Sequence, residues 1–265
     1  MRKQKFRPPA KLIVIIIVIC IGIFIIGESG KSLRNAGYFR IKEIIIKSGD
    51  TVNLSNLKGH NIFEVDLNKL SRHLEIVYPN YKKIMVVRIL PDKLFVDFIK
   101  RTPEAYIKLY KYYYIDRDAV VFDALNFTGD PGLPVITGLE TKLFGVKSGR
   151  AYDLNEIKSA LEIIREIKKS RALRDYRIKR IDVASLDNSS VFLTYFSGQD
   201  KALNNDNKPV SDLLEVKIGQ GNIFDKVNIL NSLLSQVNSD RFNIKYIDLR
   251  FKEPVIKLKD NEKKR

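Results

Sequence analysis

The longest uninterrupted apolar stretch lies near the N-terminus, where residues 12–27 carry no polar side chain. As a helix this stretch is roughly 24 Å long at about 1.5 Å per residue, close to the ~30 Å hydrocarbon core of a bilayer. The pattern predicts one transmembrane helix over residues 12–29. Residues 1–11 form a tail with five basic side chains and no acid, which predicts a cytoplasmic N-terminus and an external remainder. A cleaved signal peptide is the competing interpretation, but no small-x-small cleavage site follows the stretch.

From residue 39 onward the apolar positions change repeatedly between a period of two and a period near 3.6. Residues 40–47 predict a strand. Four apolar residues before Pro79 share one face of a predicted helix. These are Leu67, Leu70, Leu74 and Val77. Residues 81–89 and 94–99 then predict two strands joined by a tight hairpin at residues 90–93. Together the elements predict a small domain of the order β-α-α-β-β.

Short strands dominate the rest of the chain and are interrupted by two amphipathic helices. The strands are expected at residues 105–110, 112–115, 120–122, 178–185, 190–196, 214–218, 243–251 and 255–258. The helices carry the apolar stripes Leu154, Ile157, Leu161, Ile164, Ile167 and Ile223, Val227, Leu230, Leu234, Val237. Asp153 and Glu156 form a candidate capping pair for the first of them. The pattern predicts one mainly antiparallel β domain backed by two helices.

The predicted organisation has five parts. They are the basic tail at residues 1–11, the transmembrane helix at 12–29, the small domain at 38–102, the β domain at 103–258 and a charged tail at 259–265. The fold class is therefore α+β, behind a single N-terminal transmembrane helix.

Composition narrows the chemistry that such a chain can perform. The formal net charge is +16, spread along the chain, and no basic run is interleaved with aromatic residues, which argues against nucleic acid as a partner. A single cysteine, Cys20, excludes a disulfide framework and a cysteine-ligated zinc site. The two histidines, His60 and His73, leave little material for a metal site or a catalytic triad. Asp116 and Asp118 flank a predicted turn, where aspartate is common. We therefore expect no enzyme activity, no metal, no cofactor and no small-molecule substrate.

Several short motifs occur in an order that resembles one known family. They are YFRIKEI at residues 38–44, LKGHNIFEVD at 57–66, YP at 78–79, VRILPDKL at 87–94, RTPEA at 101–105, YID at 114–116, VF at 121–122, LPVITG at 133–138, VKIG at 216–219 and YIDLRF at 246–251. Each motif alone is weak, but their order behind a single span resembles the bacterial cell-division family FtsQ, called DivIB in Gram-positive bacteria. Two positions depart from the family pattern. Lys100 stands where an acid usually precedes Arg101, and Ala119 takes a turn position usually held by glycine, which predicts another turn or some strain.

The resemblance implies a fold and a role. The small domain would be a POTRA domain, followed by an FtsQ-type β domain. The chain would be a non-enzymatic scaffold in the cytoplasmic (inner) membrane at the division septum. It would gather single-pass partners of the FtsB/DivIC and FtsL types and help to control septal peptidoglycan synthesis.

The expected partner site lies on the last strands. Residues 243–251 alternate a mostly polar set with a mostly apolar one, which is typical of a strand packed on one face. The polar set is Ile244, Tyr246, Asp248 and Arg250, and the apolar set is Lys245, Ile247, Leu249 and Phe251. Few residues follow, so residues 255–258 are expected to form a free sheet edge to which a partner strand can add. The expected contact residues are Tyr246, Asp248, Arg250, Phe251, Val255 and Ile256. The resemblance implies that Phe251 contributes to that contact. The other interpretation is that Phe251 fills the core.

Two alternatives remain open at this level. The basic exterior is also compatible with a membrane-anchored module that binds an anionic cell-wall polymer. POTRA domains occur in envelope assembly factors as well, although no β-barrel follows here.

The predicted topology is tested with reporter fusions. A reporter active only outside the cytoplasm should work when it is fused after Arg265 and fail when it is fused before Met1. The N-terminus of the mature chain, read by mass spectrometry, should still include residues 1–27. A mature chain that begins near residue 30 would show a cleaved signal peptide instead.

Overall fold

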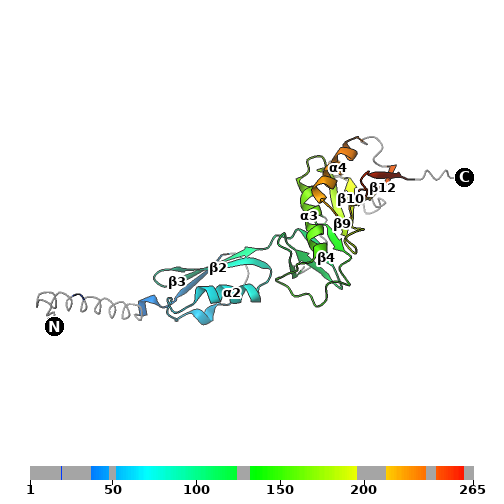
Figure 1. The fold of residues 1–265 in the computed structure, drawn as a ribbon. Coiled ribbons are helices and arrows are strands. Elements are labelled where there is room, and N and C mark those ends of the chain that lie inside the picture. The colour runs from blue at the N-terminus through cyan, green and yellow to red at the C-terminus, as the bar shows by residue number, and fades with distance from the viewer. Residues whose placement is uncertain are drawn as a thin grey trace, which may run out of the picture. The chain divides into compact units, whose positions relative to one another are not determined.

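The computed structural model describes residue 19 and residues 37–47, 52–123, 132–195, 213–236 and 243–259. The chain divides into two compact units. The first comprises Met1–Val77 and Tyr81–Lys100, and the second comprises Tyr78–Asn80 and Arg101–Arg265. Figure 1 labels the elements of both.

The predicted transmembrane helix is not tested by the described residues. Among them, no helix is long and apolar enough to cross a bilayer. Residues 12–29 lie outside the described residues except for Ile19, so this span stays a prediction.

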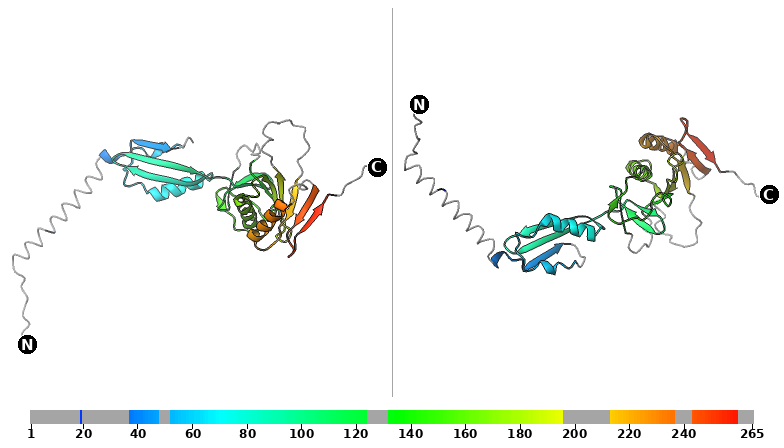
Figure 2. Two further views of the ribbon diagram at one scale, coloured as in Figure 1. Left: turned by 90° about the horizontal axis from the view of Figure 1, so that it is seen from above. Right: turned by 60° about the horizontal axis from the view of Figure 1, so that its bottom comes forward.

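The first unit is a three-stranded sheet with a helix along one face (Figure 2). Its elements are η1 (Gly37–Phe39), β1 (Glu43–Lys47), η2 (Ser55–Leu57), α2 (Leu67–Val77), β2 (Tyr81–Ile89) and β3 (Lys93–Lys100). The sheet order is β1-β3-β2, with β1 parallel and β2 antiparallel to β3. The predicted helix and hairpin are confirmed, and the first predicted helix is the short 3-10 turn η2.

The prediction that Leu74 lies on the buried face of α2 is confirmed, whereas the same prediction for Val77 is wrong. Leu74 is 4% exposed, whereas Val77 is 50% exposed because it is the last residue of the helix. Polar contacts add to this packing. The Glu75 carboxylate accepts a hydrogen bond from the Ile84 amide of β2 at 3.2 Å, and the Ser71 hydroxyl donates one to the Ile84 carbonyl. These bonds hold α2 against β2 at Ile84, which is paired with Phe98 of β3.

The second unit is built on a ten-stranded sheet of order β13-β12-β11-β10-β9-β7-β4-β5-β6-β8. Its strands are β4 (Ala105–Lys108), β5 (Tyr112–Ile115), β6 (Val120–Asp123), β7 (Val135–Thr137), β8 (Arg150–Ala151), β9 (Tyr176–Asp182), β10 (Ser190–Tyr195), β11 (Leu214–Lys217), β12 (Ile244–Asp248) and β13 (Val255–Leu258). Six of the nine neighbouring pairs are antiparallel and three are parallel, so the sheet is mixed. The prediction of a mainly antiparallel sheet is confirmed, whereas the three parallel pairs and the strands β7 and β8 were not predicted by the pattern.

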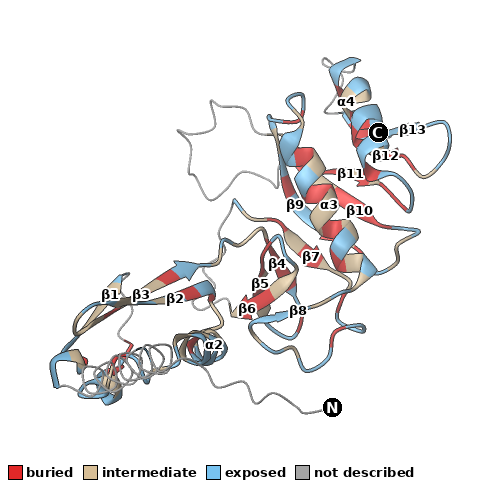
Figure 3. Ribbon diagram, turned by 60° about the vertical axis from the view of Figure 1, so that its left-hand side comes forward, coloured by how far each residue is buried: buried red, intermediate tan, exposed pale blue. Residues whose placement is uncertain are grey.

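Two helices, α3 (Asn155–Lys169) and α4 (Ile223–Gln236), supply the apolar side chains that cover the core of this sheet (Figure 3). Their buried residues are Ile157, Ala160, Ile163, Ile164 and Ile167 in α3, and Ile223, Val227, Leu230 and Leu234 in α4. Both predicted helices are confirmed, but the predicted capping pair is wrong. Leu154 takes the N-cap position without a side-chain bond, while Asp153 pairs with Lys158 and Glu156 with Lys142.

Asp116 is a structural residue of the β5–β6 turn. It is 3% exposed, and its Oδ1 accepts the amide hydrogen bonds of Asp118 and Val120 at 2.9 and 3.0 Å. Its Oδ2 pairs with the Arg101 guanidinium at 2.7 Å. Ala119 has a φ of 58° in this turn, a region that favours glycine, so the turn carries the predicted strain.

Substitution of Leu74 tests the core of the first unit. Leu74→Ala removes a buried side chain and should lower the free energy of unfolding of that unit by about 2–5 kcal/mol. His73→Ala is the matched control, since His73 is exposed on the same helix. Equal losses for the two variants in chemical denaturation would show that this helix face has been misassigned.

Candidate partner-binding edge

Strand β13 forms one end of the ten-stranded sheet. It pairs antiparallel with β12, and its other side pairs with no strand in the described part of the chain. The predicted free edge is therefore confirmed. An edge strand of this kind presents backbone N–H and C=O groups to an incoming strand.

Apolar side chains are exposed along this edge. Val255 is 48% exposed and Leu258 is 55% exposed, while Ile256 packs against the core. Phe251, which lies between β12 and β13, is 62% exposed. The interpretation of Phe251 as a core residue is therefore wrong, and its ring is available for contact.

The predicted alternation along β12 is interrupted by a bulge. The pairing of β12 with β13 runs from Ile244 to Tyr246 and skips Lys245. The extra residue shifts the face of the strand, so Ile244 is buried and Lys245 is exposed, the reverse of the prediction. Beyond the bulge, Ile247 and Leu249 are buried as expected.

At the end of β12 the buried Asp248 forms an ion pair with Arg250, whose side chain is 28% exposed. Asp248 is 4% exposed. The Arg250 Nε donates to both carboxylate oxygens of Asp248 at 2.9 and 3.2 Å, and its Nη2 donates to Oδ2 at 2.6 Å. The Arg250 amide also donates to Oδ1 at 3.1 Å. The hydrogen bonds from Arg250 lower the pKa of Asp248, because they stabilise the carboxylate more than burial destabilises it.

Two further lysines influence this carboxylate. The Lys217 ammonium lies 4.4 Å from the centre of the Tyr246 ring and also lowers the pKa of Asp248 by its charge. Lys226 donates hydrogen bonds to the carbonyls of Ile218 and Gln220, and burial lowers its pKa. Arg250 and Lys217 thus favour the charged form of Asp248, and the charge of Asp248 in turn opposes the fall in the pKa of Lys226.

Residues distant in sequence complete the arrangement around Arg250. Its Nη1 donates to the Asn188 Oδ1. Gly219 has a φ of +64°, and a Cβ there would lie 2.8 Å from the Arg250 Cγ and 2.9 Å from the Asp187 carbonyl oxygen. Only glycine therefore leaves room for the Arg250 side chain. The Arg250 guanidinium also lies 5.7 Å from the centre of the Phe251 ring. Sequence reasoning missed Asn188 and Gly219, because no local pattern connects them to Arg250.

Five of the six predicted contact residues thus divide into two groups. Phe251, Val255 and Ile256 belong to the edge itself, whereas Asp248 and Arg250 hold the chain between β12 and β13 in place. Tyr246 is half-buried beside Lys217. Among the described residues, no group of three side chains is arranged to hold a metal ion. This end of the sheet thus combines the Asp248–Arg250 pair with the exposed side chains of Phe251 and Val255.

The family model for the C-terminal domain of the cell division protein FtsQ/DivIB matches residues 105–250, more than half of the 265 residues. The chain belongs to the FtsQ/DivIB family. It is similar to the cell division protein FtsQ of Syntrophotalea carbinolica, with 24% identity over 237 residues that cover 86% of this chain and 77% of that protein. The protein of the same name from Geotalea daltonii is 24% identical over 212 residues, covering 80% of this chain and 70% of the relative. The predicted resemblance is therefore confirmed.

Substitution of Asp248 tests the buried pair. Asp248→Asn should lower the free energy of unfolding of the second unit by about 1–3 kcal/mol near neutral pH, since Arg250 loses charge-assisted hydrogen bonds. The pKa of Asp248 is lower in the folded chain than in the unfolded chain. The difference between the two proteins should therefore be full above pH ~4 and shrink as the pH falls through the folded-state pKa.

Denaturant titrations at several pH values measure this difference. Asp175→Asn removes an exposed carboxylate and serves as the control, with an expected change within about 0.5 kcal/mol at neutral pH. A difference for Asp248→Asn that stays constant down to the lowest pH would contradict the proposed pairing.

Proposed function

We propose that this chain is a non-enzymatic scaffold of bacterial cell division that binds a partner strand at the β13 edge. The free outer side of β13 carries the proposal, since it is a place where another chain can extend the sheet. Membership in the FtsQ/DivIB family supports the setting, because the matched relatives are named as cell division proteins. The partners we propose are single-pass proteins of the FtsB/DivIC and FtsL types.

The chemistry of the edge suits strand addition. Main-chain hydrogen bonds along β13 would supply directional binding, and the exposed Val255 and Leu258 would add apolar contact. Phe251 directly follows Arg250, whose backbone amide is bonded to Asp248 and whose guanidinium lies 5.7 Å from the centre of the Phe251 ring. An exposed aromatic ring that is held in place loses little conformational freedom on binding, which favours it as an anchor.

The setting in the cell is part of the same proposal. Residues 12–29 would anchor the chain in the cytoplasmic membrane, and both units would lie outside the cytoplasm at the septum. The first unit would be a POTRA domain. Its sequence of β1, η2, α2, β2 and β3 supports this assignment, as does the chain order of the family motifs.

The edge is tested by co-purification with the FtsB/DivIC-like protein of the same bacterium. Phe251→Ala should abolish co-purification while the free energy of unfolding changes by less than ~1 kcal/mol, because the ring is 62% exposed. Phe144→Ala is the matched control, since Phe144 is 78% exposed between β7 and β8, the strand at the opposite end of the sheet from β13, and should leave co-purification intact.

A truncation supplies the second arm. Deletion of residues 252–265 removes β13 and should also abolish co-purification. If partner binding survives this deletion, the contact lies outside residues 252–265. If the Phe251→Ala variant unfolds, Phe251 is part of the core. A fluorescent fusion of the full chain should gather at the septum of dividing cells.

A further inference from the structure

Three aromatic rings form a cluster at the start of the first unit. Tyr38 is 63% exposed and Phe63 is 40% exposed. Both rings meet Phe39 edge to face, with centroid distances of 5.4 Å for Tyr38 and 5.2 Å for Phe63. Phe39 is half-buried and packs against the core of the unit. Two exposed rings are thus supported by a third that belongs to the packed part of the unit.

The turn of the β2–β3 hairpin lies at the same end of the unit. The Ile62 amide donates a hydrogen bond to the Phe39 carbonyl at 2.9 Å, and the Lys42 amide donates one to the Asp92 carbonyl at 2.9 Å. Leu90, in the same turn as Asp92, is 57% exposed. We call the exposed residues of this end the apolar tip, which comprises Tyr38, Phe63 and Leu90.

The charged side chains around the apolar tip largely cancel one another. Lys42 pairs with Asp92 at 3.0 Å, and Lys93 pairs with Glu43 at 2.6 Å. The exposed residues directly beside the rings in sequence add one positive and one negative charge, at Arg40 and Glu64. The apolar tip is therefore suited to contact with an apolar phase more than with a strongly charged ligand.

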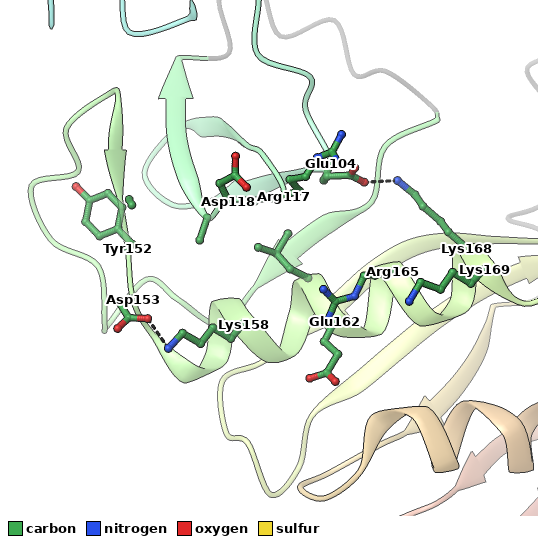
Figure 4. Close-up of a pocket in the computed structure, with 13 residues that line it drawn as sticks. Glu104, Arg117, Asp118, Tyr152, Asp153, Lys158, Glu162, Arg165, Lys168 and Lys169 are labelled. Atoms are coloured by element: carbon green, nitrogen blue, oxygen red, sulfur yellow. Dashed lines mark hydrogen bonds and ion pairs between the residues drawn. The ribbon is translucent and has the colours of Figure 1, made fainter. Parts of the chain in front are cut away.

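A hollow of about 870 Å³ in the second unit differs from the apolar tip in this respect. It lies between α3, the β5–β6 turn and β8 (Figure 4). Its charged side chains pair with one another, Lys158 with Asp153 and Lys168 with Glu104, so they select no ligand. For the apolar tip, in contrast, the sequence indicates what lies next to it.

The chain reaches the apolar tip from the predicted transmembrane helix. That span ends at residue 29, nine positions before Tyr38. Nine residues of chain reach at most roughly 30 Å when fully extended. The apolar tip therefore belongs to the first packed surface that follows the span. Exposed aromatic side chains are typical of the membrane–water interface, where a tyrosine ring meets hydrocarbon and its hydroxyl meets water.

We propose that the apolar tip docks on the outer surface of the cytoplasmic membrane, with its three side chains between the lipid headgroups and the acyl chains. This inference rests on the proposed function, since it requires the span at residues 12–29. Docking at one end orients the first unit, because β2 runs roughly 26 Å from this end to Tyr81 at about 3.3 Å per residue.

The chain contains no tryptophan, so a single introduced tryptophan reports on one place. The full-length chain is placed in vesicles of phosphatidylcholine that is brominated near the headgroup end of its acyl chains. Interfacial side chains lie ~5–10 Å deep, within reach of these bromines. The single variants Tyr38→Trp, Phe63→Trp and Leu90→Trp should each lose most of their emission, compared with unbrominated vesicles.

Two exposed positions supply the controls. Ile76 is 80% exposed near the end of α2, beside the start of β2 and away from the hairpin turn. Tyr110 is 78% exposed in the second unit. Ile76→Trp and Tyr110→Trp should keep their emission in brominated vesicles, although both positions are more exposed than those of the apolar tip.

A charge placed in the apolar tip separates docking from mere closeness to the span. Leu90→Asp, added to the Phe63→Trp variant, should restore most of the emission, because a carboxylate resists burial in the interface. Ile76→Asp adds the same charge outside the apolar tip and should restore none. The quenching should also be unchanged between about 0.05 and 0.5 M salt, since it does not depend on charge.

Flotation of the vesicles distinguishes failure of this inference from failure of the proposed membrane anchor. A chain that does not float with the vesicles would overturn both. A chain that floats while Phe63→Trp and Leu90→Trp keep their emission would overturn only the docking of the apolar tip. Equal quenching of Ile76→Trp would overturn it too, because the first unit would then contact lipid without a preferred end.

Discussion

An open β-sheet has two edge strands whose unpaired backbone N–H and C=O groups can bind strands of other chains. Each edge strand is therefore short, covered by another part of the fold, or paired with a partner strand. The two edge strands of the second unit differ in length and in exposed side chains. At one end β8 has two residues, too few to guide a long incoming strand. At the other end β13 has four residues, with Val255 and Leu258 exposed. The proposed partner edge follows from this difference in length and side-chain exposure.

The segment between β12 and β13 depends on a single ion pair. Asp248 is buried, and Arg250 satisfies its carboxylate with three side-chain hydrogen bonds and one from the backbone. Leaving the buried Asp248 carboxylate without its partner would be costly, so the pair holds this segment in one conformation. Gly219 makes room for Arg250, and Asn188 accepts its remaining bond. Phe251 directly follows Arg250. The polar contacts of Arg250 therefore fix the backbone next to an exposed aromatic ring.

Sequence patterns predicted elements where one periodicity ran without interruption. The bounds of α2, β2, β5 and β13 agree with the expected helix and strands because each has a regular apolar face or clear ends. The pattern failed where one residue was extra or where an element was very short. Lys245 shifts the alternation of β12, and β7 and β8 have only three and two residues. The predicted capping pair of α3 was wrong, since Leu154 takes the N-cap position and Glu156 pairs with Lys142.

Contacts distant in sequence set the remaining limits. The parallel pairs of β4 with β7 and β7 with β9 arise from the order of strands in the sheet, which local periodicity does not encode. Asn188 and Arg250 are 62 positions apart, so the candidate site was predicted only in its β12 and β13 residues. Ala119 shows the reverse case, since a departure from a family pattern correctly indicated a backbone with positive φ.

The proposed partner edge depends on the packing of the rest of the sheet. The buried faces of α3 and α4 join the strands from β4 to β12 in one continuous core. An edge strand that is already ordered within such a sheet can bind a partner strand without the conformational cost of ordering a flexible segment. That property suits a scaffold, because bringing proteins together requires no chemistry from the scaffold itself. The parallel pairs β4–β7 and β7–β9 have a structural role in this. They connect the strands at the β8 end of the sheet to those at the β13 end in a single hydrogen-bonded layer.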